Sequence, residues 1–181
     1  MKRIVWTFGL IAGAVLSITM VMTIAVMDVM ATENAEVIGY TTMVAAFLMV
    51  YFGVRSYRDT ALDGAIGFGR AFKVGMLIVA VASVCYVATW EVIYYRVMPD
   101  FAEKYSARVL EKAKSAGATA EQLEAKRVEM EKFGQLYKNP AFNIGMTFLE
   151  PLPVGLLIAL VSAGVLSRKR KPAGFTQPAA L

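Results

Sequence analysis

The sequence Ile4–Met27 reads IVWTFGLIAGAVLSITMVMTIAVM, contains no charged residue and directly follows Lys2 and Arg3. A helix needs roughly 20 apolar residues to cross the ~30 Å hydrocarbon layer of a bilayer. A cleaved signal peptide usually has an apolar region of only about 7–15 residues, followed by a small-x-small cleavage site. This run is longer and ends in Met27-Asp28-Val29, so it predicts a first transmembrane helix.

Three further apolar runs follow, at about residues 37–54, 74–97 and 143–167. Of the 181 residues, 57% are apolar and 18% are charged, which is more apolar than a usual soluble domain. We therefore predict an all-α, polytopic membrane protein with four transmembrane helices in the lipid bilayer. Residues 1–171 form one integral membrane domain in this prediction, and 172–181 form a disordered cytoplasmic tail.

The short segments that carry Lys and Arg belong on one side of the membrane, whereas the long segment from about Arg96 to Lys138 carries both signs and, at that length, crosses largely regardless of charge. Lys and Arg occur at residues 2–3, between 55 and 73, and at 168–171, whereas segment 28–36 has acidic residues and no Lys or Arg. Short loops rich in Lys and Arg stay in the cytoplasm. We therefore predict that both termini are cytoplasmic and that the long segment between the third and fourth spans is external.

The external segment, at about 99–138, carries the signals of two helices. Asp100 with Glu103 resembles a helix start, Gly117 is a stop, and Thr119-Ala120-Glu121-Gln122 fits a capping box. Apolar residues recur on one face of each helix: Phe101, Tyr105, Val109 and Ala113 on the first, and Leu123, Met130, Phe133 and Tyr137 on the second. We predict an amphipathic helical hairpin. Its apolar face packs as a cap within the hairpin, on the span ends or on the membrane interface, or else binds a partner.

The composition excludes several kinds of chemistry. There is no histidine and only one cysteine, Cys85, which rules out a Ser-His-Asp triad, His-ligated zinc and an intrachain disulfide. The net charge is +5, but the basic residues are scattered and do not form the single basic face of a nucleic-acid-binding protein. We expect no catalytic residues, no metal, no cofactor and no nucleic-acid partner.

Two acidic residues within or beside the apolar runs form the candidate polar site. Glu150 begins the sequence Glu150-Pro151-Leu152-Pro153. A carboxylate inside a span costs about 2.5–3.5 kcal/mol unless a partner or water satisfies it, and the prolines leave backbone carbonyls free nearby. Glu150 lies either inside the bilayer or at its outer boundary, and Glu91 has the same two placements. A polar vestibule or a structural ion pair would also include Arg96, Tyr94 and Tyr95.

Four basic residues at the cytoplasmic ends of the second and third spans are candidate contacts for lipid headgroups, with an acidic phospholipid as ligand. They are Arg55, Arg58, Arg70 and Lys73. The glycine-rich stretch 64–75 lacks the complete Rossmann and P-loop patterns. We expect its small residues to let the third span approach a neighbouring helix closely.

Two stretches carry a family resemblance: Gly53-Val54-Arg55-Ser56-Tyr57-Arg58-Asp59 and GFGRAFKVG at residues 67–75. They resemble a bacterial membrane family catalogued as domain of unknown function 4199, and the similarity extends over nearly the whole chain, including the closing helix 155–171. The resemblance implies an inner-membrane protein, common among Bacteroidota, with segment 99–138 in the periplasm. The family has no established activity, substrate or cofactor, so no catalytic residue is carried over.

The sequence therefore predicts a non-enzymatic accessory or scaffold subunit with a periplasmic helical cap, acting with a membrane-protein partner or as a homo-oligomer. The alternative is a small oligomeric transporter or channel that uses Glu91 and Glu150 in a proton or cation path. Because four helices enclose little volume, such a pore needs several copies. The two hypotheses differ in whether the glutamates face a hydrated cavity or lipid headgroups.

Overall fold

The computed structural model describes residues 1–27 and 35–167, and all regular structure in these ranges is helical. The helices are α1 (Lys2–Met27), α2 (Ala35–Ala61), α3 (Phe68–Arg96), α4 (Phe101–Ser115), α5 (Ala120–Tyr137), α6 (Pro140–Leu149) and α7 (Leu152–Leu166). The prediction of an all-α fold is confirmed.

Four helical segments are long and apolar enough to cross a membrane, which confirms the predicted number of candidate spans. They are Lys2–Ile24, Val37–Ala61, Phe68–Arg96 and Pro140–Leu166, the last of which combines α6 and α7. Many of their large apolar side chains are exposed on the outside of the bundle, among them Trp6, Ile18, Met22, Val44, Leu48, Val84, Val92, Leu157 and Val161. An apolar outer surface of this kind is typical of a protein surrounded by lipid.

The helices extend beyond the predicted spans at several ends. α2 continues past residue 54 to Ala61, and α3 begins at Phe68 rather than at residue 74. The predicted spans stopped at charged residues, but a charged side chain does not interrupt helical hydrogen bonding when it stands on an exposed face, as Arg55 and Lys73 do. The predicted tail at 172–181 lies outside the described residues.

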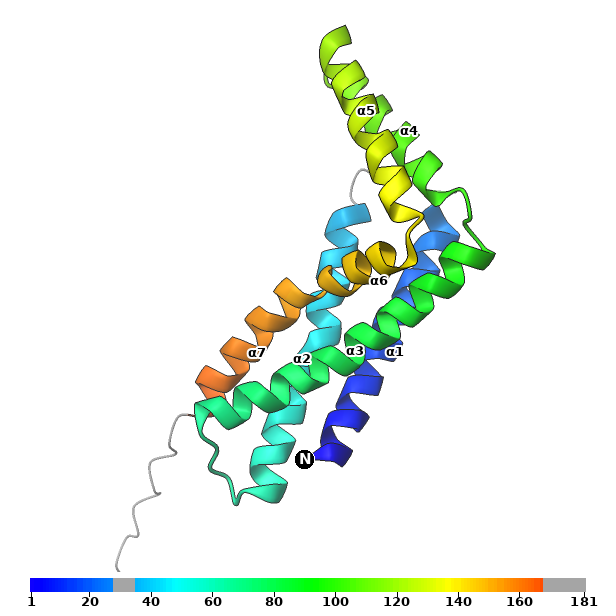
Figure 1. The fold of residues 1–181 in the computed structure, drawn as a ribbon. Coiled ribbons are helices and arrows are strands. Elements are labelled where there is room, and N and C mark those ends of the chain that lie inside the picture. Colours follow the sequence, from blue (N-terminus) through cyan, green and yellow to red (C-terminus); the bar gives the residue numbers. More distant parts are fainter. Residues whose placement is uncertain (28–34, 168–181) are drawn as a thin grey trace, which may run out of the picture.

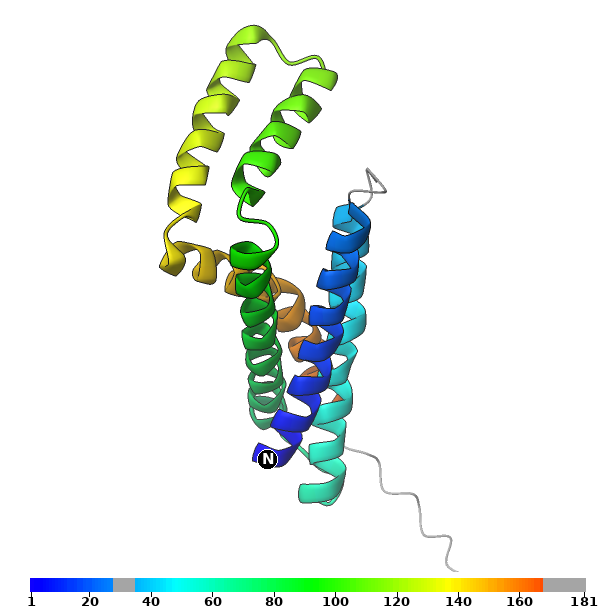
Figure 2. The same cartoon turned by 90° about the vertical axis from the view of Figure 1, so that its right-hand side faces the viewer.

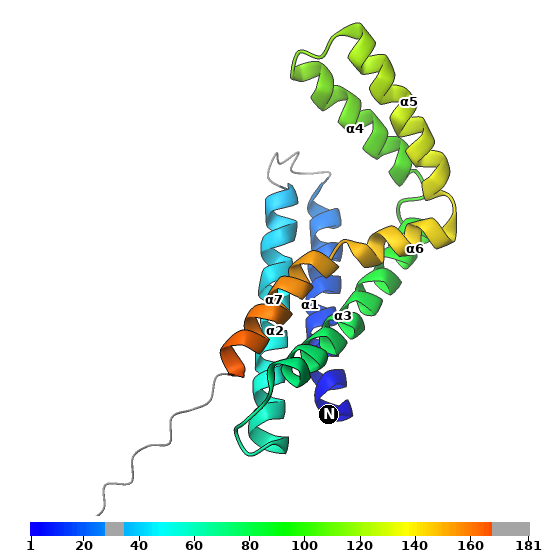
Figure 3. The ribbon, with the colours of Figure 1, turned by 60° about the vertical axis from the view of Figure 1, so that its left-hand side comes forward.

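The fourth span is divided, as the prolines predicted. α6 ends at Leu149 and α7 begins at Leu152, and the chain bends between them (Figure 3). Proline has no backbone N–H, so Pro151 and Pro153 remove two donors from the helical ladder. The break lies at Glu150, which is the C-cap residue of α6.

The bundle consists of α1, α2, α3 and α7, with α2 and α3 each packed against both α1 and α7. Glycines make the close contacts. A Cβ atom added at Gly13 of α1 would lie 2.6 Å from Cys85 Cβ of α3, and one at Gly155 of α7 would lie 2.5 Å from Val79 Cγ1. Helices in membranes associate through such small residues, because lipid provides no hydrophobic force between them.

The glycine-rich stretch only partly fulfils its predicted role. Gly75 packs against Ala159 of α7, with a Cβ position 3.1 Å from Ala159 Cβ. Gly64, Gly67 and Gly69 have no atom within 4 Å of the same position. Gly64 instead adopts a φ of 85° in the turn between α2 and α3, so residues 64–67 form part of the turn and residues 68–75 form the start of α3.

α4 and α5 form an antiparallel hairpin that projects beyond one end of the bundle (Figure 2). Gly117, with a φ of 83°, lies in the turn, and the capping box is confirmed, since Thr119 Oγ1 accepts from the Gln122 N–H at 3.3 Å and Gln122 Oε1 accepts from the Thr119 N–H at 2.9 Å. Asp100 is the N-cap residue of α4, as predicted, but the prediction that its side chain caps the helix is wrong. Asp100 makes no side-chain cap and pairs with Lys104 Nζ at 3.1 Å.

Six of the predicted basic residues lie near one end of the bundle. The N-terminus, the turn between α2 and α3, and the end of α7 lie at the end away from the hairpin (Figure 1). The predicted basic residues near this end are Lys2, Arg3, Arg55, Arg58, Arg70 and Lys73. The end that carries the hairpin also carries α6.

Candidate functional site

Three side chains with polar groups lie on the face of α3 that packs against α6 and α7. Ser83, Tyr86 and Trp90 follow Val79 at helical spacings of four, three and four, which places them on one side of the helix. Val79 faces Gly155 of α7. The polar groups are therefore turned toward the fourth span.

α6 provides the opposite side of this contact. Asn139 caps it, with Oδ1 accepting a hydrogen bond from the Ala141 N–H at 3.0 Å, and Pro140 occupies the first turn, where the loss of its N–H costs no helical hydrogen bond. Asn143, Thr147 and Glu150 then follow at spacings of four and three, which places them on one side of α6. We use the name polar seam for Ser83, Tyr86 and Trp90 of α3 together with Asn143, Thr147 and Glu150.

Asn143 is the centre of the buried part of the polar seam. Its Oδ1 accepts hydrogen bonds from Trp90 Nε1 at 3.0 Å and from Thr147 Oγ1 at 3.3 Å, and Asn143 and Thr147 are both buried. The indole N–H only donates, so it fixes the Asn143 oxygen toward Trp90. The Nδ2 atom then points elsewhere and is buried with no hydrogen-bond partner among the described residues.

A third hydrogen bond of the polar seam is at the helix break. Tyr86 donates its hydroxyl to Glu150 Oε2 at 3.1 Å. Because Pro151 and Pro153 have no N–H, the carbonyls of Thr147 and Leu149 lack the donors of a regular helix. A carboxylate, a phenol and two carbonyls that lack helical donors are therefore found together at this point.

An aromatic cluster joins the hairpin to the bundle, and we call it the aromatic joint. Its members are Trp90 and Tyr94 of α3, Phe101 of α4, and Phe133 and Tyr137 of α5. Ring centroids are 4.7 Å apart for Trp90 and Phe101, 5.5 Å for Tyr94 and Tyr137, and 5.2 Å for Phe133 and Tyr137. The apolar face of the hairpin thus packs on itself and on the end of α3.

Tyr137 shows how well this joint excludes water. The side chain is buried, and this burial raises its pKa to about 12. Hydrogen bonding with Thr147 and Trp90 acts in the opposite direction and lowers the pKa, but burial has the larger effect. A buried phenol resists ionisation because its anion would lose water. The end of α5 is therefore held in an apolar environment.

The predicted polar site is divided by the structure. Glu150 is paired with Tyr86, and Tyr94 belongs to the aromatic joint. Glu91, Tyr95 and Arg96, with Val92, line a shallow, open hollow on the outer surface of α3. Glu91 follows Tyr86 by five residues, about 140° around the helix, and so faces away from α6. Its Oε1 atom is buried with no hydrogen-bond partner among the described residues.

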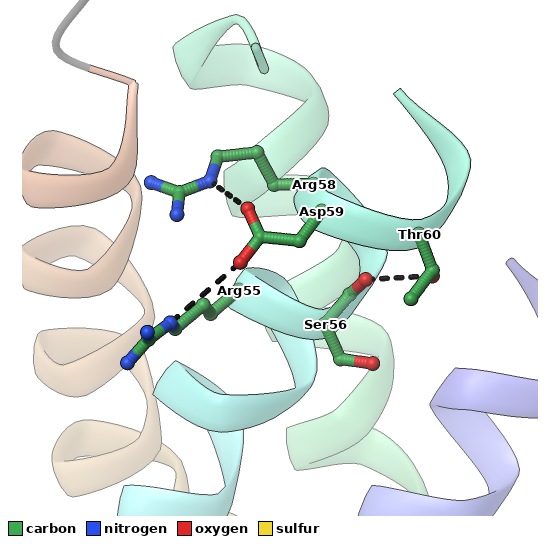
Figure 4. A network of polar contacts seen from close by, with 5 residues as sticks. All are labelled: Arg55, Ser56, Arg58, Asp59 and Thr60. Carbon is green, nitrogen blue, oxygen red and sulfur yellow. Dashed lines mark hydrogen bonds and ion pairs between the residues drawn. The ribbon is translucent and has the colours of Figure 1, made fainter. Parts of the chain in front are cut away.

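Two of the predicted lipid contacts form a cluster with an acidic residue near the end of α2. Asp59 Oδ1 accepts from Arg58 Nε at 2.7 Å, and Asp59 Oδ2 lies 3.6 Å from Arg55 Nε (Figure 4). Arg70 and Lys73 are exposed in the first turns of α3. We use the name arginine cluster for Arg55, Arg58 and Asp59.

These features define a class: an all-helical protein with four helices able to cross a membrane and a helical hairpin between the third and fourth. Residues 7–168 match the family described as "Protein of unknown function (DUF4199)". The chain belongs to this family, as the resemblance predicted. No curated protein and no solved structure matches it.

Proposed function

We propose that the chain is a non-enzymatic accessory or scaffold subunit of the bacterial inner membrane, and that it holds the hairpin of α4 and α5 in a fixed position in the periplasm. The observation that carries this proposal is the aromatic joint. A hairpin on a flexible linker would change its direction freely. Here five aromatic side chains, three of them buried, connect both hairpin helices to α3, so the hairpin presents the same surface to any partner.

The sidedness of the proposal rests on the basic residues. The end of the bundle opposite the hairpin carries the exposed Lys2, Arg3, Arg70 and Lys73. Short basic segments stay in the cytoplasm, which leaves the hairpin on the other side. Reporter fusions at residue 1 and at Gly117 test this arrangement, since an enzyme active only in the periplasm should be active at Gly117 alone.

The docking surface of a scaffold would be the outer face of α5. Val128 and Leu136 are exposed there, while the residues that face α4 are covered. A photocrosslinking residue at Leu136 should give one discrete heavier product in cells, and the same residue at Val84 on the lipid-facing side of α3 is the control position. Loss of the product when Tyr94 and Tyr137 are both changed to Ala would support the fixed hairpin. Products containing only this chain from Leu136 would contradict an accessory role with another protein.

A second candidate function is the small oligomeric transporter or channel, and the hydrogen bond between Tyr86 and Glu150 at the helix break supports it. Tyr86 lies about 18 Å along α3 from Val74 at 1.5 Å per residue. If the ~30 Å apolar layer begins near Val74, this depth supports the proposal that Glu150 lies inside the bilayer rather than at its boundary. Proton or cation flux in proteoliposomes should then fall when Glu150 or Glu91 is changed to Gln, with Glu124→Gln on the hairpin as the control. Equal flux in all three variants would exclude this function.

A further inference from the structure

The arginine cluster has a geometry suited to holding an anion. Asp59 contacts the Nε atom of each arginine, and both guanidinium groups extend to the side of α2 on which α7 lies (Figure 4). A guanidinium has five N–H donors, of which Nε supplies one. The terminal nitrogens of both arginines therefore lie on the same side of α2, and one carboxylate contacts both Nε atoms (Figure 4).

The side chains of the two arginines differ in how much of their surface is exposed. The Arg58 side chain is only 17% exposed and is held close to the helix, whereas that of Arg55 is 55% exposed. Paired guanidinium groups are a common means of binding phosphate, because each makes two parallel hydrogen bonds to its oxygens. A phosphate oxygen bound here would accept hydrogen bonds from the terminal N–H groups of the two guanidinium groups, whose Nε atoms contact Asp59.

A column of exposed apolar side chains runs along α2 from the arginine cluster toward the N-terminal end of the helix. Phe52, Leu48 and Val44 precede Arg55 by three, seven and eleven residues, which keeps them on one side of the helix. They are 44%, 49% and 47% exposed. Over the eleven residues from Arg55 to Val44, the column extends about 16 Å along the axis of α2, toward the middle of the apolar span.

We propose that the arginine cluster and this column together form a binding site for an anionic phospholipid. The phosphate binds Arg55 and Arg58, and an acyl chain lies along Phe52, Leu48 and Val44. A free phosphate would use only the arginines, so the apolar column favours the lipid. This inference goes beyond the proposed scaffold role and rests on the proposed membrane placement.

Asp59 distinguishes a built site from general attraction between charges. If only net charge matters, removing Asp59 strengthens binding to anionic lipid. If the orientation of the guanidinium groups matters, Asp59→Ala weakens binding although it adds one positive charge. The built site requires the second result.

The experiment compares lipid retention by the full chain purified into nanodiscs of phosphatidylcholine with added phosphatidylglycerol. Native mass spectrometry counts the phosphatidylglycerol molecules that stay bound. The double variant R55A/R58A should lose affinity by roughly tenfold, the equivalent of about 1.4 kcal/mol. The control K2A/R3A removes the same charge at the same end of the bundle and should lose little. Inorganic phosphate at millimolar concentration should not displace the lipid.

Three results would overturn the inference: an equal loss in the two double variants, stronger retention by Asp59→Ala, or displacement by inorganic phosphate. If R55A/R58A does not enter nanodiscs, R55K/R58K applies the same test, because lysine keeps the charge but lacks the planar fork. Failure of the unaltered chain to enter nanodiscs would contradict the membrane placement. Entry without any preference for phosphatidylglycerol would contradict only the lipid site.

Discussion

Replacing Gly155 by alanine tests whether glycine contacts determine the packing of α7. The added Cβ atom would lie 2.5 Å from Val79 Cγ1, 2.9 Å from Val79 Cγ2 and 3.3 Å from Phe47 Cζ. Carbon atoms pack best at about 3.5–4.0 Å, so the shortfall at Val79 is about 1 Å. Valine is branched at Cβ and has one strongly preferred rotamer in a helix, so α7 must move away from α3.

The magnitude follows from two opposing effects. Overpacking costs about 1–3 kcal/mol, while replacing glycine inside a helix gains about 0.5–1 kcal/mol. Gly164→Ala is the matched control on the same helix, because no atom lies within 4 Å of its Cβ position. Both substitutions carry the same gain in helix propensity. The difference in the free energy of unfolding between the two variants should therefore equal the packing cost, about 1–3 kcal/mol.

Thermal unfolding in a mild detergent measures this difference. One kcal/mol corresponds to about 2–4 °C in Tm for a chain of this size, so Gly155→Ala should melt roughly 2–12 °C below Gly164→Ala. Adding Val79→Ala to Gly155→Ala should recover part of the loss, because it removes both clashing methyl groups. The same Tm for Gly155→Ala and Gly164→Ala would refute the reasoning.

Three further predictions concern the hairpin end. Asn143→Leu should cost about 1–3 kcal/mol because it leaves the buried Trp90 indole N–H without its acceptor, whereas Trp90→Phe should cost less because Asn143 Oδ1 keeps the hydrogen bond from Thr147. A double-mutant cycle by thermal unfolding should show that the double variant costs less than the sum. Thr119→Ala should weaken the start of α5 by about 1 kcal/mol, seen as faster amide exchange in its first turn, whereas unchanged exchange would mean that the capping box adds nothing. Because the Tyr137 pKa is raised to about 12, its contribution to stability should be complete below pH 10 and be lost as the pH rises through 12. The tyrosinate absorbance of the protein minus that of Tyr137→Phe should have its midpoint near that pH, and a midpoint near 10 would show an exposed ring.

The sequence was sufficient to predict the helical architecture because apolar length and helix signals are local. The capping box at Thr119, the turn at Gly117 and the break at Glu150 each depend on residues within a few positions. Asp100 had the same kind of signal, but its side chain pairs with Lys104. A local sequence pattern predicts where a helix begins more reliably than it predicts which partner the N-cap side chain binds.

The polar seam could not be predicted, because it depends on how α3 and α6 are aligned. The sequence contains Tyr86 and Asn143 as isolated polar residues in apolar runs, and nothing local states that Tyr86 meets Glu150 or that Asn143 meets Trp90. The spacing of Asn143, Thr147 and Glu150 was a signal that one face of α6 is polar. The partner of that face came only from the three-dimensional fold.

The contacts along α3 change in kind near Cys85. Up to and including Cys85, α3 touches its neighbours α7 and α1 at close contacts that involve a glycine, as at Gly75, Val79 and Cys85. Beyond it, Tyr86, Thr89 and Trp90 add hydrogen bonds to α6 and α1, beside the apolar packing around Trp90. A contact through glycine tolerates no added methyl group, whereas a hydrogen-bonded contact depends on a particular pair of side chains. The first half of α3 should therefore be sensitive to side-chain volume, and the second half to the loss of a polar partner.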